Sequence, residues 1–200
     1  MTTPLQDISS IAPLAADGKN KKPADPVVAD YEEGKRLLES HNYGQAAVSL
    51  HNALLGYEEK GDEAGIANAS NQLGHVCLAR KEYEQAKRNY QRAWEICEKL
   101  QDPMSQIALQ KQFIAIYCGL KDYSQAIMVC LDLLDRYYMN NDPRGAIKVM
   151  EEMATIYLAA GERAKAADAY RTVASIHQNF QHRTTAEGYL KKARELEEAA

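Results

Sequence analysis

The chain has 200 residues, of which 46% are hydrophobic and 26% are charged, as is usual for a protein with a packed core. Its formal net charge of −4 provides no broad positive surface for a nucleic-acid backbone, which argues against DNA or RNA as a main partner. No stretch has the roughly 20 consecutive apolar residues that cross a bilayer, and the start, MTTPLQDISS, lacks the basic and apolar regions of a signal peptide. We therefore expect a cytoplasmic protein that does not insert into membranes.

The first part of the chain differs in composition from the rest. Residues 1–26 contain four of the six prolines and show no sustained apolar period. Their three lysines are balanced by three aspartates, so the segment is not a basic arm. This composition predicts a flexible leader ahead of a repeat domain that spans residues 27–200.

The repeat domain shows a period of 40 residues. Four related hexapeptides recur at this spacing: HNYGQA (41–46), KEYEQA (81–86), KDYSQA (121–126) and GERAKA (161–166). A second landmark with the same spacing contains helix breakers: GDE (61–63), QDP (101–103), NDP (141–143) and, in a weaker form, QHR (181–183). Aspartate followed by proline is typical of an N-cap and a first helical residue, so new helices should begin near residues 63, 103 and 143. The hexapeptides then mark the turn inside each repeat.

Each repeat is therefore expected to consist of a first helix, helix A, and a second helix, helix B. The expected helix pairs span 27–40 and 43–60, 63–80 and 83–100, 103–120 and 123–139, and 143–160 and 163–180. They form repeats over residues 27–62, 63–102, 103–142 and 143–182. Apolar residues in each helix B recur on one face, as Ala46, Leu50, Ala53 and Tyr57 do in the first repeat. A further helix over 183–198, rich in Lys and Glu, is expected to cap the open end of the stack.

The second repeat carries the clearest resemblance to a known family. Its Leu73, Gly74, Tyr83, Ala86, Tyr90 and Ala93 resemble the pattern of the tetratricopeptide repeat (TPR) superfamily, in the branch with longer, 40-residue repeats. The third and fourth repeats replace the helix A glycine with Ile114 and Ala154. The resemblance covers residues 27–180 and implies an all-α, right-handed superhelix, an α-solenoid of four TPR-like repeats with a C-terminal capping helix.

The resemblance also implies a binding groove that is lined mainly by the A helices. The residues that repeat position places in this groove are Tyr31, Lys35, Asn68, Asn71, His75, Lys111, Gln112, Ala115, Lys148, Glu151 and Thr155. Three lysines against one glutamate make this lining basic, so the expected ligand is an acidic or carboxylate-bearing peptide or helix of a partner protein. The alternative interpretation is that these are ordinary solvated residues on an exposed face.

No arrangement of residues commits the chain to catalysis, to a metal or to a cofactor. His75 and Cys77 are two positions apart on one expected helix and so point to different faces. The four cysteines form no CxxC pair and fall within expected helices, which favours reduced, buried thiols over disulfides. His177 occupies the repeat position of Tyr57 and Tyr137, which favours a packed, hydrogen-bonded histidine over a ligand-binding one. We therefore expect a non-enzymatic protein-interaction adaptor.

Two other functions stay open at this point. A self-associating structural scaffold is indicated by Tyr137, Tyr138 and Met139, the most apolar end of any helix B. A chaperone for a secreted or assembly-prone client would fit the small size and acidic charge but has no motif of its own. A further hypothesis is that the leader, residues 1–26, folds back into the groove and blocks it.

Overall fold

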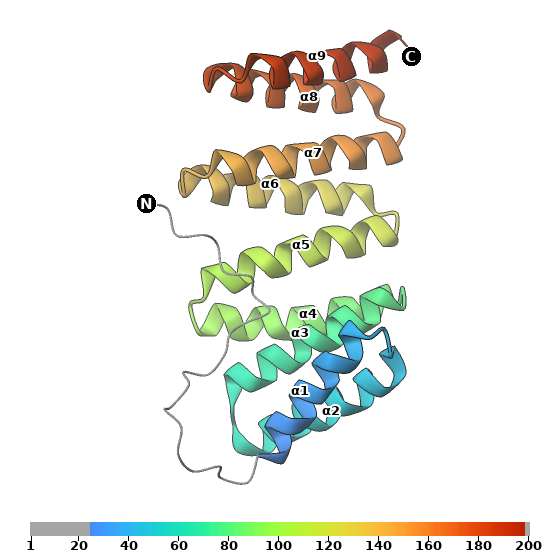
Figure 1. Cartoon of the computed structure of the whole chain (residues 1–200), viewed down its shortest axis with the longest axis vertical. Coiled ribbons are helices and arrows are strands. Elements are labelled where there is room, and N and C mark those ends of the chain that lie inside the picture. The colour runs from blue at the N-terminus through green and yellow to red at the C-terminus, as the bar shows by residue number, and fades with distance from the viewer. Residues whose placement is uncertain (1–24, 199–200) are drawn as a thin grey trace. The chain divides into compact units, whose positions relative to one another are not determined.

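A computed structural model describes residues 25–198, and every regular element in this range is an α-helix (Figure 1). The helices are α1 (Pro26–Glu39), α2 (Tyr43–Lys60), α3 (Glu63–Ala79), α4 (Tyr83–Lys99), α5 (Pro103–Gly119), α6 (Tyr123–Met139), α7 (Pro143–Ala159), α8 (Arg163–Asn179) and α9 (Arg183–Glu198). Every boundary lies within one residue of the span expected from the 40-residue period. The leader expected over residues 1–26 lies outside the described residues, apart from Asp25 and Pro26, which cap and begin α1.

The chain divides into two compact units whose boundary lies inside α5, between Gln112 and Phe113. We call them the N-terminal unit and the C-terminal unit and describe each by itself. In the N-terminal unit α1 packs against α2, α2 against α3 and α3 against α4. In the C-terminal unit α6 packs against α7, α7 against α8 and α8 against α9. No helix in the described part of the chain is long and apolar enough to cross a membrane.

The turns between the described helices share one geometry. A residue with positive φ stands at the same point of each turn, every 20 positions: His41, Gly61, Lys81, Gln101, Lys121, Asn141, Gly161 and Gln181. After α3, for example, the Lys81 N–H donates to the Leu78 carbonyl at 3.0 Å and the Glu82 N–H to the Cys77 carbonyl at 2.8 Å. Such bonds satisfy the free carbonyls at a helix end. Most of these positions carry a side chain that disfavours positive φ, so the packing of the helices must hold the turn.

The aspartates of the breaker motifs act as N-caps, as their sequence context predicts. The Asp62 and Asp142 carboxylates accept from the backbone N–H of Gly65 and of Gly145, each at 2.9 Å. Asp102 accepts from the Ser105 N–H at 3.1 Å. The fourth breaker has His182 at this position, and α9 nevertheless begins at Arg183. The aspartates therefore stabilise the first turns of α3, α5 and α7.

The core depends on matching side-chain sizes between helix A and helix B. A Cβ atom on Gly34 would lie 2.5 Å from Leu50, and one on Gly74 would lie 2.6 Å from Tyr90. Leu50 and Tyr90 are fully buried, so only glycine leaves room for them. The positions that replace Gly74 and Tyr90 in the third repeat hold Ile114 and Cys130, and both are fully buried.

Candidate functional site

In the N-terminal unit, α1 presents an aromatic side chain beside a cation. The ring of Tyr31 packs edge-on against Tyr57 of α2, with 6.2 Å between ring centroids. Burial raises the pKa of Tyr31 to about 12. The Lys35 ammonium lies 5.3 Å from the Tyr31 ring centroid and 3.2 Å from a Glu32 carboxylate oxygen, and the Lys35 side chain is 24% exposed. These contacts hold the Lys35 side chain beside the Tyr31 ring on α1.

The next helix A, α3, adds two amides to the same unit. Asn68 and Asn71 are three positions apart, so they lie on one face of α3, and both are half-buried. Neither side-chain amide has a hydrogen-bond partner among the residues that the structure describes. A side-chain amide offers two N–H donors and a carbonyl acceptor. These asparagines therefore present unused hydrogen-bonding groups beside the Tyr31 helix.

His75, the third predicted groove residue on α3, has a partner inside the protein. Its Nδ1 lies 2.9 Å from the Tyr90 hydroxyl of α4, and the two rings meet edge to face with centroids 5.4 Å apart. Burial lowers the pKa of His75 below its ordinary value. Burial therefore favours the neutral imidazole, and its bond to Tyr90 leaves it less free to meet a ligand than the two asparagines are.

Some of the remaining predicted groove residues are exposed, and others bond to neighbouring groups of the protein. Lys111 and Gln112 of α5 end the N-terminal unit, and Lys111 is exposed. In the C-terminal unit Lys148 is exposed, but the Glu151 carboxylate accepts from the Tyr189 hydroxyl of α9. The Thr155 hydroxyl donates to the Glu151 backbone carbonyl at 3.1 Å. Tyr31 and Lys35 thus contact each other on α1, and the two asparagines lie on α3 of the same unit, while Glu151 and Thr155 serve contacts within the C-terminal unit.

An aromatic cluster joins α8 to α9. The His177 ring stacks on Tyr189 with 5.5 Å between centroids, and its Nδ1 lies 3.3 Å from Nδ1 of His182. Tyr170 stacks on the same Tyr189, and the Lys192 ammonium lies 5.0 Å from the Tyr189 centroid. His177 is therefore packed and hydrogen-bonded, as its repeat position predicts. In the sequence, this cluster is signalled by His182, which stands where the other breaker motifs have aspartate.

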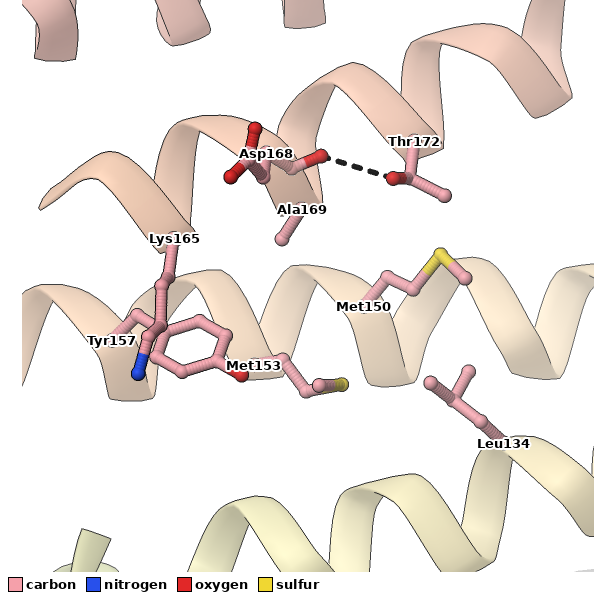
Figure 2. Close-up of a pocket in the computed structure, with 8 residues that line it drawn as sticks. All are labelled: Leu134, Met150, Met153, Tyr157, Lys165, Asp168, Ala169 and Thr172. Carbon is pink, nitrogen blue, oxygen red and sulfur yellow. Dashed lines mark hydrogen bonds between the residues drawn. The ribbon is translucent and has the colours of Figure 1, made fainter. Parts of the chain in front are cut away.

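A cavity of about 290 Å³ lies in the C-terminal unit between α6, α7 and α8 (Figure 2). Met150, Met153 and Tyr157 of α7 form its floor, and Leu134 of α6 stands opposite α8. The α8 side is formed by Lys165, Asp168, Ala169 and Thr172. Sequence reasoning missed this cavity because every lining position reads as an ordinary core or surface position of a helix.

The cysteines occupy packing positions. Cys77, Cys97 and Cys130 are buried and Cys118 is half-buried, and all four are free thiols. Burial raises the pKa of Cys130 to about 12 and raises that of the other three thiols as well. A thiol that resists ionisation is a poor nucleophile. Across residues 25–198 no three His, Cys, Asp or Glu side chains gather as metal ligands.

The self-association surface expected at the end of α6 is smaller than the sequence suggested. Tyr137 is buried and its ring packs directly on Gly145 of α7. A Cβ atom at Gly145 would lie only 2.3 Å from that ring. Tyr138 and Met139 are exposed. Only these last two of the three residues face solvent.

Comparisons with known proteins bear on the fold. No protein-family profile and no curated protein matches the chain. Among solved structures, the chain is similar to the nearly identical TPR-like repeats assigned to a kinesin light chain of Podosopora anserina. That match has 15% identity and a TM-score of 0.62, and it covers 87% of this chain and 97% of the other. A double mutant of MamA RS-1 is similar at 14% identity with a TM-score of 0.56, covering 88% of this chain and 97% of the other. At such identities the likeness establishes the fold, and this chain has the α-solenoid fold of TPR-type repeats.

Proposed function

We propose that the chain is a protein-interaction adaptor whose N-terminal unit binds a peptide or helix of a partner protein along α1 and α3. The observation that supports this most is the pair Asn68 and Asn71, two half-buried amides without a protein partner on one face of α3. In the free protein these half-buried amides are open to hydration, and the backbone of a bound peptide can replace that water with direct hydrogen bonds. Two asparagines about one turn apart suit successive peptide groups of a bound chain.

The surroundings of the asparagine pair suit an acidic ligand. Lys35 lies on the neighbouring α1 and Lys111 is exposed at the end of the same unit. The Lys35 ammonium is already shared with the exposed Glu32, and exchange of that partner for a ligand carboxylate costs little because surface ion pairs are weak. Tyr31 adds an aromatic surface beside the Lys35 ammonium. An acidic segment with apolar residues matches this combination of charge and ring.

The test uses a peptide display library that is selected on the full chain. Selected peptides should be enriched in Asp and Glu. The double variant Asn68→Ala and Asn71→Ala should lower the affinity of the chain for these peptides by about tenfold or more, as expected for the loss of two hydrogen bonds to the ligand. Titration by fluorescence anisotropy measures the change.

A matched control is the double variant His51→Ala and Asn52→Ala, because both residues are exposed on α2. This control should bind the selected peptides like the original chain. Equal affinity of the asparagine variant and the original chain for every selected peptide would show that α3 does not form the binding surface.

Charge reversal tests the expected character of the ligand. Lys35 and Lys111, the two lysines of the N-terminal unit that the proposal uses, are changed together to Glu, and binding of the acidic peptides is measured at low salt. Affinity should fall, and the remaining affinity should depend less steeply on salt, because long-range attraction is screened by ions. Unchanged binding at low salt contradicts an acidic ligand but leaves the asparagine test unaffected, so the two parts of the proposal fail separately.

A further inference from the structure

The solvent-facing side of α6 carries an apolar stripe that its counterparts lack. Met128, Leu131, Tyr138 and Met139 are 57%, 48%, 53% and 82% exposed. Spacings of three and seven residues place the first three on one side of the helix. The equivalent positions hold Arg88, Gln91, Glu98 and Lys99 in α4, and Asp168, Arg171, Gln178 and Asn179 in α8; in α2 they hold one apolar residue, Val48, with His51, Glu58 and Glu59. The same fold therefore does not need apolar residues at these positions, and an exposed apolar stripe indicates a contact surface.

The stripe borders the cavity of the C-terminal unit. Leu134 is three residues after Leu131 and four before Tyr138, so the three side chains are neighbours along α6. Figure 2 shows Leu134 facing the side chains of Met150 and Met153 of α7, which form the cavity floor. Methionine side chains are flexible and polarizable, and they adapt to varied apolar partners. The exposed stripe and the cavity thus offer a helix both a surface and a recess for one anchoring side chain.

The charged residues of α6 are Asp132, Asp135 and Arg136, and Asp135 lies between Leu131 and Met128 around the helix. Asp132 and Asp135 are exposed on α6, and neither makes an ion pair within the described part of the chain. The cation at the cavity, Lys165, is already paired with Glu162 and lies 5.6 Å from the Tyr157 ring centroid. The carboxylates of α6 are therefore available to basic groups of a partner.

We propose that this surface, formed by the α6 stripe and the adjoining cavity, binds an amphipathic helix of another protein that carries Lys or Arg beside its apolar side. The apolar residues of that helix cover Leu131 and Tyr138 and place one side chain in the cavity, while its cations meet Asp132 and Asp135. A second copy of this chain fits less well, because pairing two α6 helices brings four unpaired carboxylates together. The surface lies in the C-terminal unit and is independent of the function proposed for α1 and α3.

The test uses two synthetic amphipathic peptides of 17 residues, the length of α6. Both have the same leucine stripe, and the flanking residues are lysine in one and glutamate in the other. Fluorescence anisotropy with the full chain should show that the lysine peptide binds about tenfold or more tightly than the glutamate peptide. The triple variant Met128→Arg, Leu131→Gln and Tyr138→Glu should lower affinity for the lysine peptide by about tenfold.

This triple variant is designed to keep the fold and the net charge. Its residues are those of Arg88, Gln91 and Glu98 at the equivalent exposed positions of α4, and the added Arg and Glu cancel. Circular dichroism should therefore match the original chain. The control Val48→Arg with Leu55→Glu changes two exposed apolar residues of α2 in the other unit and should leave binding unchanged. Asp132→Lys with Asp135→Lys should reverse the preference in favour of the glutamate peptide.

Several outcomes would overturn the proposal. Equal affinity for the two peptides would contradict a basic partner. Unchanged affinity of the triple variant for the lysine peptide would show that the α6 stripe is not the binding surface. A loss of the same size in the α2 control shows that the binding is not specific to α6. If sedimentation velocity detects a dimer that the triple variant abolishes, the occupant is a second copy of the chain rather than a basic helix.

Discussion

The hairpin of α3 and α4 and the hairpin of α5 and α6 reach the same backbone geometry with opposite distributions of side-chain volume. In the first, Gly74 of helix A leaves space for the fully buried Tyr90 of helix B. In the second, the equivalent residues are a large Ile114 and a small Cys130, both fully buried. The Lys81 and Lys121 turns of both hairpins have the same φ of 60°. The comparison teaches that the large residue of the pair can come from either helix.

The largest effect is expected when the first hairpin receives the helix A residue of the second. Gly74→Ile should destabilise the protein by about 3 to 4 kcal/mol, because the new side chain occupies the space of the Tyr90 ring. Urea denaturation followed by circular dichroism measures this. The double variant Gly74→Ile with Tyr90→Cys recreates the second hairpin's pair and should recover at least about half of the loss. A double variant that is as unstable as the sum of its two single changes would show that volume is not exchanged between these positions.

The converse change tests the second hairpin. Ile114→Gly removes a fully buried side chain and should cost about 3 kcal/mol through lost burial, a cavity and the flexibility of glycine in a helix. Addition of Cys130→Tyr should restore part of this stability, although Cys130→Tyr alone overpacks the core. The free energies of unfolding of the original chain, the two single variants and the double variant, measured by urea denaturation, form a double-mutant cycle. A coupling free energy near zero would argue that Ile114 and Cys130 pack independently.

A pH dependence should distinguish the two hairpins. Burial lowers the pKa of His75, whereas the equivalent residue of α5 is Ala115. The unfolded chain then binds a proton more readily than the folded chain, so stability is present above about pH 6.5 and falls as the pH drops below it. One such group contributes a slope of no more than about 1.4 kcal/mol per pH unit. His75→Gln should flatten this part of the stability profile, and an unchanged slope would assign it to other groups.

The smallest effect is expected where the two hairpins agree. Lys81→Gly and Lys121→Gly should each stabilise the protein by about 0.5 to 1 kcal/mol, because glycine adopts positive φ without the steric cost that a Cβ atom brings. The two gains should be similar, since the two turns have the same φ of 60°. Thermal unfolding detects the difference. A gain in one turn only would show that the hairpins differ in their turns as well as in their cores.

Helix positions followed from the sequence with little error. The aspartates at 62, 102 and 142 mark helix starts because a carboxylate at that point satisfies free backbone N–H groups, a local interaction that needs no knowledge of the fold. The candidate site followed only in part. His75 and Asn71 have the same periodic signature, yet His75 reaches Tyr90 on α4 while Asn71 has no partner in the described residues. The reach of a side chain across to another helix is not encoded in the spacing of its own helix.

The 40-residue period, the helix boundaries and the small residues of the helix contacts were therefore determined by the sequence alone, because they depend on capping, helical periodicity and local volume. Tertiary structure decided which groove-facing side chains find a partner on another helix, as His75 and Asn71 show. It also decided that Met150 and Met153 border a cavity beside Leu134 rather than a filled core. These outcomes depend on the shape left between helices after they pack, and that shape is set by many side chains together.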